Sequence, residues 1–324
     1  MLKRPRRNRS SATIRGLVQE THLGVEHLVY PLFVVDGKNI KEEITSLPGN
    51  YRLSPDLILQ EIESCWKLGL RTFIIFPAVK ETLKDKYATY GYAPDNFYLQ
   101  LARTIKTQFP ECCLISDVAM DPYSSDGHDG LVENGKILND ETLPILAKMA
   151  VAQAAAGFDY VGPSDMMDGR VQAIREALDK KGYHETGILS YTAKYASAFY
   201  GPFRDALDSA PKAGDKKTYQ MNPANSREAL LEAELDTAEG ADMLMVKPAL
   251  NYLDVIAKLK QHSTLPIVCY HVSGECAMLL AACEKGWLNY ETAMPETLLS
   301  LRRAGADVII TYFAKDYAKM LHAI

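Results

Sequence analysis

Two lysines stand at the ends of apolar runs that are typical of buried strands. Lys247 ends the run Met243 to Lys247, and Lys194 ends the run Ile188 to Lys194. Burial disfavours a charged ammonium group, and a second cation nearby lowers the pKa of a lysine further. Each lysine is therefore a candidate amine nucleophile that forms an imine with a carbonyl compound. For either lysine alone, a solvated position in a loop or at the start of a helix is the alternative.

The elements that must position these lysines follow a repeated pattern. Four times a helical segment ends in glycine, and a polar residue then precedes an apolar strand, at Gly69, Gly157, Gly240 and Gly305. A glycine just past a helix closes it in the left-handed conformation. The remaining strand candidates are Leu28 to Val35, Cys113 to Ala119, Thr186 to Ser190 and Leu265 to Val272.

Eight strands that alternate with helices predict an α/β protein with a (β/α)8 TIM barrel at residues 26–324. In such a barrel the carboxyl ends of all strands surround one mouth, so Lys194 and Lys247 are expected to point into the same site. An open doubly wound sheet is the alternative architecture. No Gly-x-Gly-x-x-Gly motif follows a strand, so nothing indicates a nucleotide site.

Two segments lie outside a minimal barrel. Residues 1–25 form an N-terminal arm with a basic cluster from Lys3 to Arg9. Taken alone, the cluster fits a nucleic-acid or membrane arm, an interaction arm or a solvated tail. Residues 201–223 form a long polar insertion after the strand that ends at Lys194, and we predict an active-site lid there. A disordered surface loop is the alternative for this insertion.

The composition is that of an ordinary globular protein. Hydrophobic residues make up 47% of the chain and charged residues 24%, and the net charge of -5 argues against a general nucleic-acid binder. No run approaches the roughly 18 apolar residues that cross a bilayer. The six cysteines form no Cys-x-x-Cys pair, and no secretory leader is evident. We therefore expect reduced cysteines, a cytoplasmic location, and neither a membrane nor a nucleic-acid partner.

Four motifs carry a resemblance to a known family. They are Met-Val-Lys-Pro around Lys247, Ser-Tyr-Thr-Ala-Lys-Tyr-Ala around Lys194, Tyr-Gly-Pro-Phe-Arg-Asp at 200–205 and Pro-Ser-Asp-Met-Met-Asp-Gly-Arg at 163–170. From about Arg4 to Tyr312 the chain resembles the porphobilinogen synthase (5-aminolaevulinate dehydratase) family. The resemblance implies that two molecules of 5-aminolaevulinate condense to porphobilinogen, with Lys247 on the propionate side and Lys194 at the second substrate.

The resemblance also implies which residues bind the two substrate carboxylates. Ser273 and Tyr312 match the positions that bind the first carboxylate. The second is assigned to three residues of the predicted lid, Arg204, Lys216 and Gln220. Lys216 replaces an arginine found in some members, so a point charge takes the place of a bidentate clamp.

Asp117 is the candidate for positioning the substrate amine or accepting protons, because it lies at the end of the predicted strand Leu-Ile-Ser-Asp-Val at 114–118. A helix cap is the alternative for a lone aspartate at the end of a strand. Ser164 and Tyr200 are expected beside it.

The metal requirement is where the chain departs from zinc-dependent members of the family. Those members have three cysteines where this chain has Ala119, Asp121 and Asp129. Hard oxygen ligands suit magnesium or a monovalent ion rather than a thiolate-bound zinc. We therefore expect no catalytic zinc and no organic cofactor. His128 in the same loop is expected to be solvated or to donate a hydrogen bond rather than to bind a metal.

A magnesium site is expected away from the chemistry. By resemblance, Glu232 holds a hydrated, allosteric magnesium ion at a subunit boundary, and Arg9 reaches that site from a neighbouring subunit. The arms are then expected to build a homo-octamer. A solvated carboxylate on a helix is the alternative for Glu232.

Two other functions stay open at this point. An imine-forming aldolase that acts on sugar phosphates would need one lysine and a glycine-rich phosphate loop, which the chain lacks. A non-catalytic barrel that acts as a binding protein would not require lysines at two buried strand ends.

Overall fold

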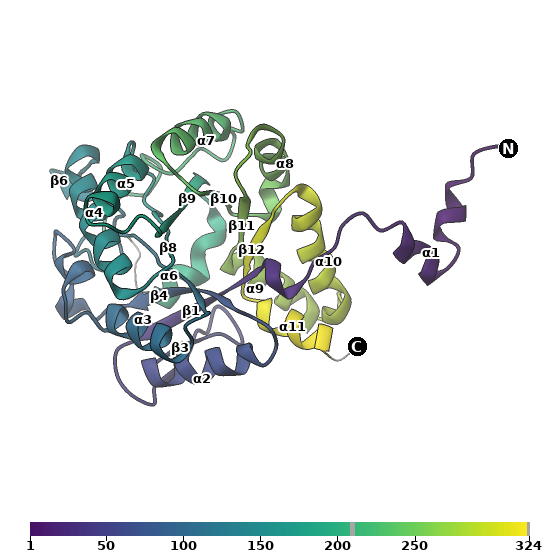
Figure 1. Ribbon diagram of the computed structural model, residues 1–324, viewed down its shortest axis with the longest axis horizontal. Helices are drawn as coiled ribbons and strands as arrows, with labels where there is room; N and C mark the ends of the chain where they lie inside the picture. Colours follow the sequence, from purple (N-terminus) through teal and green to yellow (C-terminus); the bar gives the residue numbers. More distant parts are fainter. Residues whose placement is uncertain (208–210, 323–324) are drawn as a thin grey trace.

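Eight parallel strands form a closed barrel in the computed structural model, which describes residues 1–207 and 211–322 (Figure 1). Neighbouring barrel strands pair in the order β1, β4, β5, β8, β9, β10, β11 and β12, and β12 pairs with β1 to close the ring. Their bounds are Leu28–Val35, Thr72–Ala78, Cys113–Ile115, Tyr160–Val161, Gly187–Lys194, Met243–Lys247, Ile267–His271 and Val308–Thr311. The predicted TIM barrel is confirmed.

Helices surround the barrel, as Figure 1 shows. The α-helices after the arm are α2 (Pro55–Trp66), α3 (Phe97–Gln108), α4 (Asn139–Ala156), α5 (Arg170–Lys180), α6 (Gly201–Leu207), α7 (Glu228–Glu239), α8 (Leu253–His262), α9 (Ser273–Glu284), α10 (Tyr290–Ala304) and α11 (Ala314–His322). Short 3-10 helices are η2 (Val25–His27), η3 (Glu81–Leu83), η4 (Thr89–Tyr92), η5 (Ala198–Tyr200) and η6 (Leu250–Tyr252).

The glycines that were predicted to close helices do so. Gly157 follows α4 with φ 100°, and Gly240 follows α7 with φ 102°. A residue with a Cβ rarely adopts this left-handed conformation, so glycine lets the chain turn at once into β8 and β10. The strands that follow are buried on both faces, because helices cover the outside and side chains fill the inside.

The strand predicted over residues 113–119 is shorter in the structure. β5 ends at Ile115, but the backbone N–H groups of Ser116 and Val118 still donate to the carbonyl oxygens of Tyr160 and Gly162, at 2.9 and 3.0 Å. The chain beyond Ile115 therefore follows its neighbour without regular geometry. As a result, Asp117 lies at an irregular strand end that opens into the barrel mouth.

Two hairpins were not predicted. β2 (Lys41–Glu43) and β3 (Tyr51–Leu53) are antiparallel, and β3 joins the sheet at the carboxyl end of β1. β6 (Leu131–Glu133) and β7 (Lys136–Leu138) form a separate pair before α4. Both hairpins have only three-residue strands, which are too short for alternation to mark them in the sequence.

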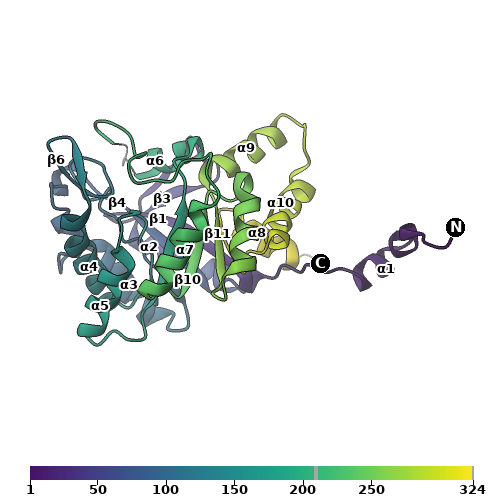
Figure 2. The same cartoon turned by 90° about the horizontal axis from the view of Figure 1, so that it is seen from above.

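The predicted lid begins as a helix. α6 lies across one end of the barrel, beside α9 (Figure 2). Part of the lid prediction, residues 208–210, lies outside the described residues. The α6 helix forms because Ala206 and Leu207 are buried and the ring of Phe203 packs between Phe33 and Phe76, with centroids 5.7 and 5.0 Å away.

The N-terminal arm extends away from the barrel, as both views show (Figures 1 and 2). It contains η1 (Pro5–Arg9) and α1 (Ala12–Leu17), and no residue of either helix is buried. Leu17 is 82% exposed. Among residues 1–207 and 211–322, no helix has the length and apolar character needed to span a bilayer.

Candidate active site

The two strand-end lysines lie side by side in the barrel mouth. β9 and β10 are adjacent parallel strands, and Lys194 and Lys247 are paired in their register. Lys194 is 6% exposed and Lys247 is 5% exposed. The prediction that both amines share one buried site is confirmed.

Lys247 is surrounded by aromatic rings. Its Nζ atom lies 4.6 to 5.4 Å from four ring centroids, those of Tyr191, Tyr200, Phe203 and Tyr270. Burial, together with the positive charge of Lys194, lowers the pKa of Lys247 to about 7. A substantial fraction of this amine is therefore neutral and nucleophilic near pH 7.

Lys194 has polar neighbours instead. Its Nζ atom lies 3.7 Å from an Oδ2 atom of Asp129 and donates to the backbone carbonyl oxygen of Ser164. The ring of Tyr191 stands near both amines, with its centroid 5.7 Å from the Lys194 Nζ atom. The two lysines therefore occupy different environments, which the matching strand-end positions did not reveal.

Lys216 reaches from the lid into the site. Its Nζ atom lies 3.2 Å from Asp121 Oδ2 and 3.0 Å from Asp129 Oδ1, and all three side chains are buried. Burial lowers the pKa of Lys216, but the two carboxylates outweigh this effect and raise it. Burial alone would raise the pKa of Asp129, and the charges of Lys194 and Lys216 bring it below the usual range. Lys216 thus binds both carboxylates in this state and, together with Lys194 beside Asp129, offsets their negative charge.

The residues at the position of the zinc site do not fit a thiolate-bound zinc. Ala119 offers no ligand, and the carboxylates of Asp121 and Asp129 are bound to the Lys216 ammonium. Throughout residues 1–207 and 211–322, no group of three or more histidine, cysteine, aspartate and glutamate side chains is arranged to hold a metal ion.

Asp117 is held at the irregular end of β5. Its backbone N–H donates to Tyr98 Oη at 3.2 Å, and its carbonyl oxygen accepts from Gln153 Nε2 at 2.9 Å. Burial, and next the charge of Asp121, raise the pKa of Asp117 to about 7. Its Oδ1 atom has no hydrogen-bond partner among the described residues. A carboxyl group in this state can both accept and return protons near neutral pH.

The expected carboxylate-binding residues divide between the barrel and the lid. Ser273 begins α9, and its Oγ atom accepts a hydrogen bond from the backbone N–H of Phe203 at 3.0 Å. Tyr312 Oη lies 3.0 Å from Tyr270 Oη, near the Lys247 rings. Arg204 is half-buried in α6, and Gln220 is buried beyond Lys216.

Tyr200 and Ser164 form hydrogen bonds to other groups of the site in this state. The Tyr200 hydroxyl donates to the carbonyl oxygens of Tyr195 and Lys247, at 2.8 and 3.1 Å. Ser164 presents its carbonyl oxygen to Lys194 and its hydroxyl to Asp117. Both residues therefore help to fix the positions of groups at the barrel mouth.

Sequence reasoning missed three of the four aromatic residues around Lys247, which are Tyr191, Phe203 and Tyr270, and it missed the buried Asp165. Phe203 and Tyr191 stand within the quoted motifs, at three residues from Tyr200 and from Lys194, but an apolar residue there reads as core packing. Asp165 is buried and follows Ser164, whose carbonyl oxygen accepts from Lys194. Burial raises the pKa of Asp165 to about 6. Only the fold brings Tyr191 and Phe203 to the lysines.

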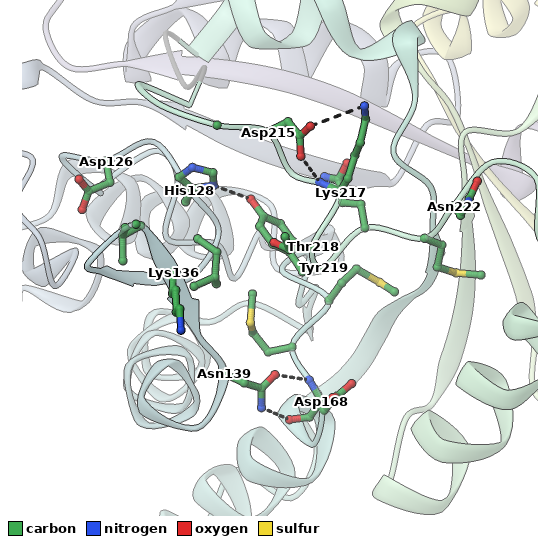
Figure 3. A pocket seen from close by; sticks show the side chains of 18 of the residues that line it. Asp126, His128, Lys136, Asn139, Asp168, Asp215, Lys217, Thr218, Tyr219 and Asn222 are labelled. Carbon is green, nitrogen blue, oxygen red and sulfur yellow. Dashed lines mark hydrogen bonds and ion pairs between the residues drawn. The ribbon is translucent and has the colours of Figure 1, made fainter.

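A cavity of about 1100 Å³ lies between the lid and helix α7 (Figure 3). Glu232 lines it together with Glu228 and Asp168. Burial raises the pKa of Glu232 to about 7, and the charges of Asp236 and Asp168 add to the effect against that of Arg170. A buried carboxylate in these acidic surroundings gains from a nearby positive charge. Arg9 of the same chain lies in the extended arm.

Comparisons with known proteins agree with this geometry. The family model described as delta-aminolevulinic acid dehydratase matches residues 2–320. The delta-aminolevulinic acid dehydratase of Chlamydia pneumoniae is 53% identical over 320 residues, which cover 99% of this chain and 96% of that protein. The enzyme of the same name from Bradyrhizobium diazoefficiens is 50% identical over 319 residues, which cover 98% of this chain and 90% of that protein.

A solved structure is similar over nearly the whole chain. It is delta-aminolevulinic acid dehydratase (porphobilinogen synthase) from Toxoplasma gondii, in complex with the reaction product porphobilinogen. The TM-score is 0.97 and the identity 53%, over 98% of this chain and 91% of that one.

Proposed function

The chain belongs to the delta-aminolevulinic acid dehydratase family, and we propose that its paired strand-end lysines bind the two substrate molecules of that family's reaction. It is a lyase that condenses two molecules of 5-aminolaevulinate, which is delta-aminolevulinic acid, to porphobilinogen. The register pair of Lys194 and Lys247 is the observation that supports the residue assignment most strongly.

Lys247 is the amine best prepared to attack a ketone. Its pKa of about 7 leaves a neutral amine at working pH, and the surrounding rings exclude water from the carbinolamine and the imine. Ser273 and Tyr312 would hold the carboxylate of this first substrate. The Ser273 hydroxyl can donate to that carboxylate while its Oγ atom still accepts from the backbone N–H of Phe203, which links binding to the position of α6.

Lys194 would hold the second substrate as a second imine. Each imine releases one water, and formation of the carbon–carbon and carbon–nitrogen bonds of the ring returns both lysine amines, so two waters are lost in total. Asp117, with its raised pKa and a free Oδ1 atom among the described residues, would position the substrate amine and accept protons.

The lid would supply the cations for the second carboxylate. Arg204, Lys216 and Gln220 belong to it, and Lys216 already reaches the site through Asp121 and Asp129. Because Lys216 is paired with these two carboxylates in the substrate-free state, substrate binding requires the ammonium to share or exchange its partners. Closing the lid and capturing the carboxylate are then one event.

Conversion of the substrate without zinc tests this proposal. The protein is incubated with 5-aminolaevulinate in a magnesium buffer without an organic cofactor, with and without a zinc-selective chelator. We expect a product with the mass of two substrates less two waters, at rates that agree within about 2-fold, because oxygen ligands retain zinc weakly. No product in either sample would contradict the function. Product that is lost with the chelator and restored by zinc would contradict the zinc-independent assignment alone.

We also propose an allosteric magnesium ion at Glu232 and a cytoplasmic homo-octamer. A bound magnesium ion supplies positive charge and a shell of ordered waters. The acidic surroundings of Glu232 favour such a charge, and the exposed basic arm with Arg9 would reach the site of a neighbouring subunit. Millimolar magnesium is expected to raise activity and to shift sedimentation toward the octamer, because an ion that binds at a boundary favours the assembled state.

Replacement of Glu232 tests whether magnesium acts at this site or at another site. Glu232→Ala is expected to abolish both magnesium responses, whereas the control Glu234→Ala, on the exposed side of the same helix, is expected to keep them. Activity and sedimentation velocity are measured with and without magnesium for each variant. An unchanged response in Glu232→Ala would place the ion elsewhere.

A further inference from the structure

His128 is bound to the lid at two points. Its Nε2 atom lies 2.8 Å from the carbonyl oxygen of Ala213, and its Nδ1 atom lies 3.1 Å from the hydroxyl of Tyr219 (Figure 3). The side chain belongs to the loop after β5 and is only 6% exposed. The sequence had suggested either a solvated histidine or a hydrogen-bond donor, and the structure confirms the second.

The hydrogen bonds define one tautomer of the imidazole. A carbonyl oxygen only accepts, so Nε2 carries the proton and donates to Ala213. In the neutral ring Nδ1 is then the acceptor, and the Tyr219 hydroxyl donates to it. That hydroxyl in turn accepts from the backbone N–H of Asp129 at 3.4 Å. Donors and acceptors therefore match throughout the chain from Ala213 to Asp129.

The two contact points lie on either side of Lys216 in the sequence. The backbone N–H groups of Tyr219 and Gln220 donate to the carbonyl oxygen of Lys216, at 3.4 and 2.9 Å, so residues 216–220 form a compact turn. The same turn sends the Lys216 side chain to Asp129, which follows His128 directly. Holding Ala213 and Tyr219 against this loop thus fixes where the lysine enters the site.

We propose that His128 is a positioning residue that clasps lid residues 213–219 and so places Lys216 between Asp121 and Asp129. This inference rests on the proposed function, in which Lys216 binds a substrate carboxylate. His128 touches no reacting atom itself. It acts through the position of the lid. In this chain no zinc is expected to bind the loop of His128 to the lid.

Other contacts leave the middle of the lid dependent on this clasp. At the far end, the backbone N–H of Met221 donates to the carbonyl oxygen of Lys194 at 2.9 Å, which joins the lid to β9. At the near end, the N–H of Lys212 donates to the carbonyl oxygen of Asp126 at 3.1 Å. Between these two points, His128 and the carboxylates around Lys216 hold the lid to the barrel.

Hydrogen exchange and steady-state kinetics of matched variants test the proposal. His128→Ala removes both contacts, and Tyr219→Phe removes one hydroxyl but keeps the ring. His128→Gln retains a donor for Ala213 and is a partial rescue. The control is His184→Gln, because His184 is 67% exposed on the barrel surface, where its Nδ1 atom lies 3.4 Å from Asp179 Oδ1.

His128→Ala is expected to accelerate amide exchange in residues 211–220 about 10-fold and to raise KM for 5-aminolaevulinate by a similar factor, because two hydrogen bonds are lost. Tyr219→Phe and His128→Gln are expected to lie between this variant and the wild type. The amount of imine trapped on Lys247 at saturating substrate is expected to stay unchanged. Exchange outside the lid is also expected to match that of His184→Gln.

Unchanged lid exchange in His128→Ala and Tyr219→Phe would overturn the proposal, and so would an acceleration spread evenly over the barrel. If His128→Ala does not fold, Tyr219→Phe decides, because it alters the clasp without changing the histidine. A wild-type protein that forms no porphobilinogen would contradict the proposed function. The exchange measurement would then still report whether the clasp exists.

Discussion

Replacing Lys247 with methionine is expected to lower kcat/KM for porphobilinogen formation on the order of 10⁴-fold or more, as for other residues that form the covalent intermediate. Methionine keeps an unbranched chain among the four aromatic rings, so the barrel should fold. Lys247→Arg should be equally inactive, because a guanidinium keeps the charge but is not a free amine near neutral pH. Product formation and thermal unfolding are measured for both variants.

A lysine outside the site provides the control for this prediction. Lys258 lies on helix α8, where it pairs with Asp254 at 3.5 Å, and Lys258→Met is expected to change the rate by less than about 2-fold. If folded Lys247→Met kept roughly a tenth of the wild-type rate, Lys247 would not be the amine that binds the first substrate. The loss would then reflect packing alone.

Replacing Lys194 with methionine is expected to abolish condensation, with a loss on the order of 10³-fold or more, while an imine still forms on Lys247. The reason is that the second substrate loses its amine but the first keeps its own. The variant also changes the charge beside Lys247. The positive charge of Lys194 disfavours a protonated Lys247, so its removal raises the pKa of Lys247 above about 7.

The sign of this shift gives a second measurement. With a higher pKa, less of Lys247 is neutral at pH 7, so imine trapping as a function of pH should move to higher pH in Lys194→Met. Trapping yields are compared with the wild type across neutral pH at saturating substrate. A profile that moved to lower pH would contradict the electrostatic coupling. Loss of the adduct at every pH would mean that the two sites do not act separately.

The barrel and its lysines were predictable because local signals mark them. Helix-closing glycines such as Gly157 and Gly240 mark the point where the chain turns into the next strand. A lysine at the end of a buried run is costly to bury as an ammonium, so its presence there indicates that the amine has a function. These signals depend on neighbouring residues alone. The register pair of Lys194 and Lys247 then follows from the parallel order of β9 and β10.

The rest of the site depends on contacts between distant segments. Phe203 precedes Lys247 by more than 40 residues in the chain. It covers Lys247 only because α6 folds back over the barrel mouth. The pairing of Lys216 with Asp121 spans 95 residues, and that of His128 with Tyr219 spans 91. Polar residues in loops carry no periodicity, so nothing in the sequence reveals which of them meet.

Reductive trapping of the substrate tests the central claim most directly. The protein is mixed with 5-aminolaevulinate, reduced with borohydride, and examined by intact mass and by peptide mapping. A reduced imine adds a stable adduct, and we predict it on the peptide that contains Lys247 in the wild type and in Lys194→Met, but not in Lys247→Met. An adduct absent from Lys247 in the wild type, or one that persists elsewhere in Lys247→Met with activity retained, would contradict the account.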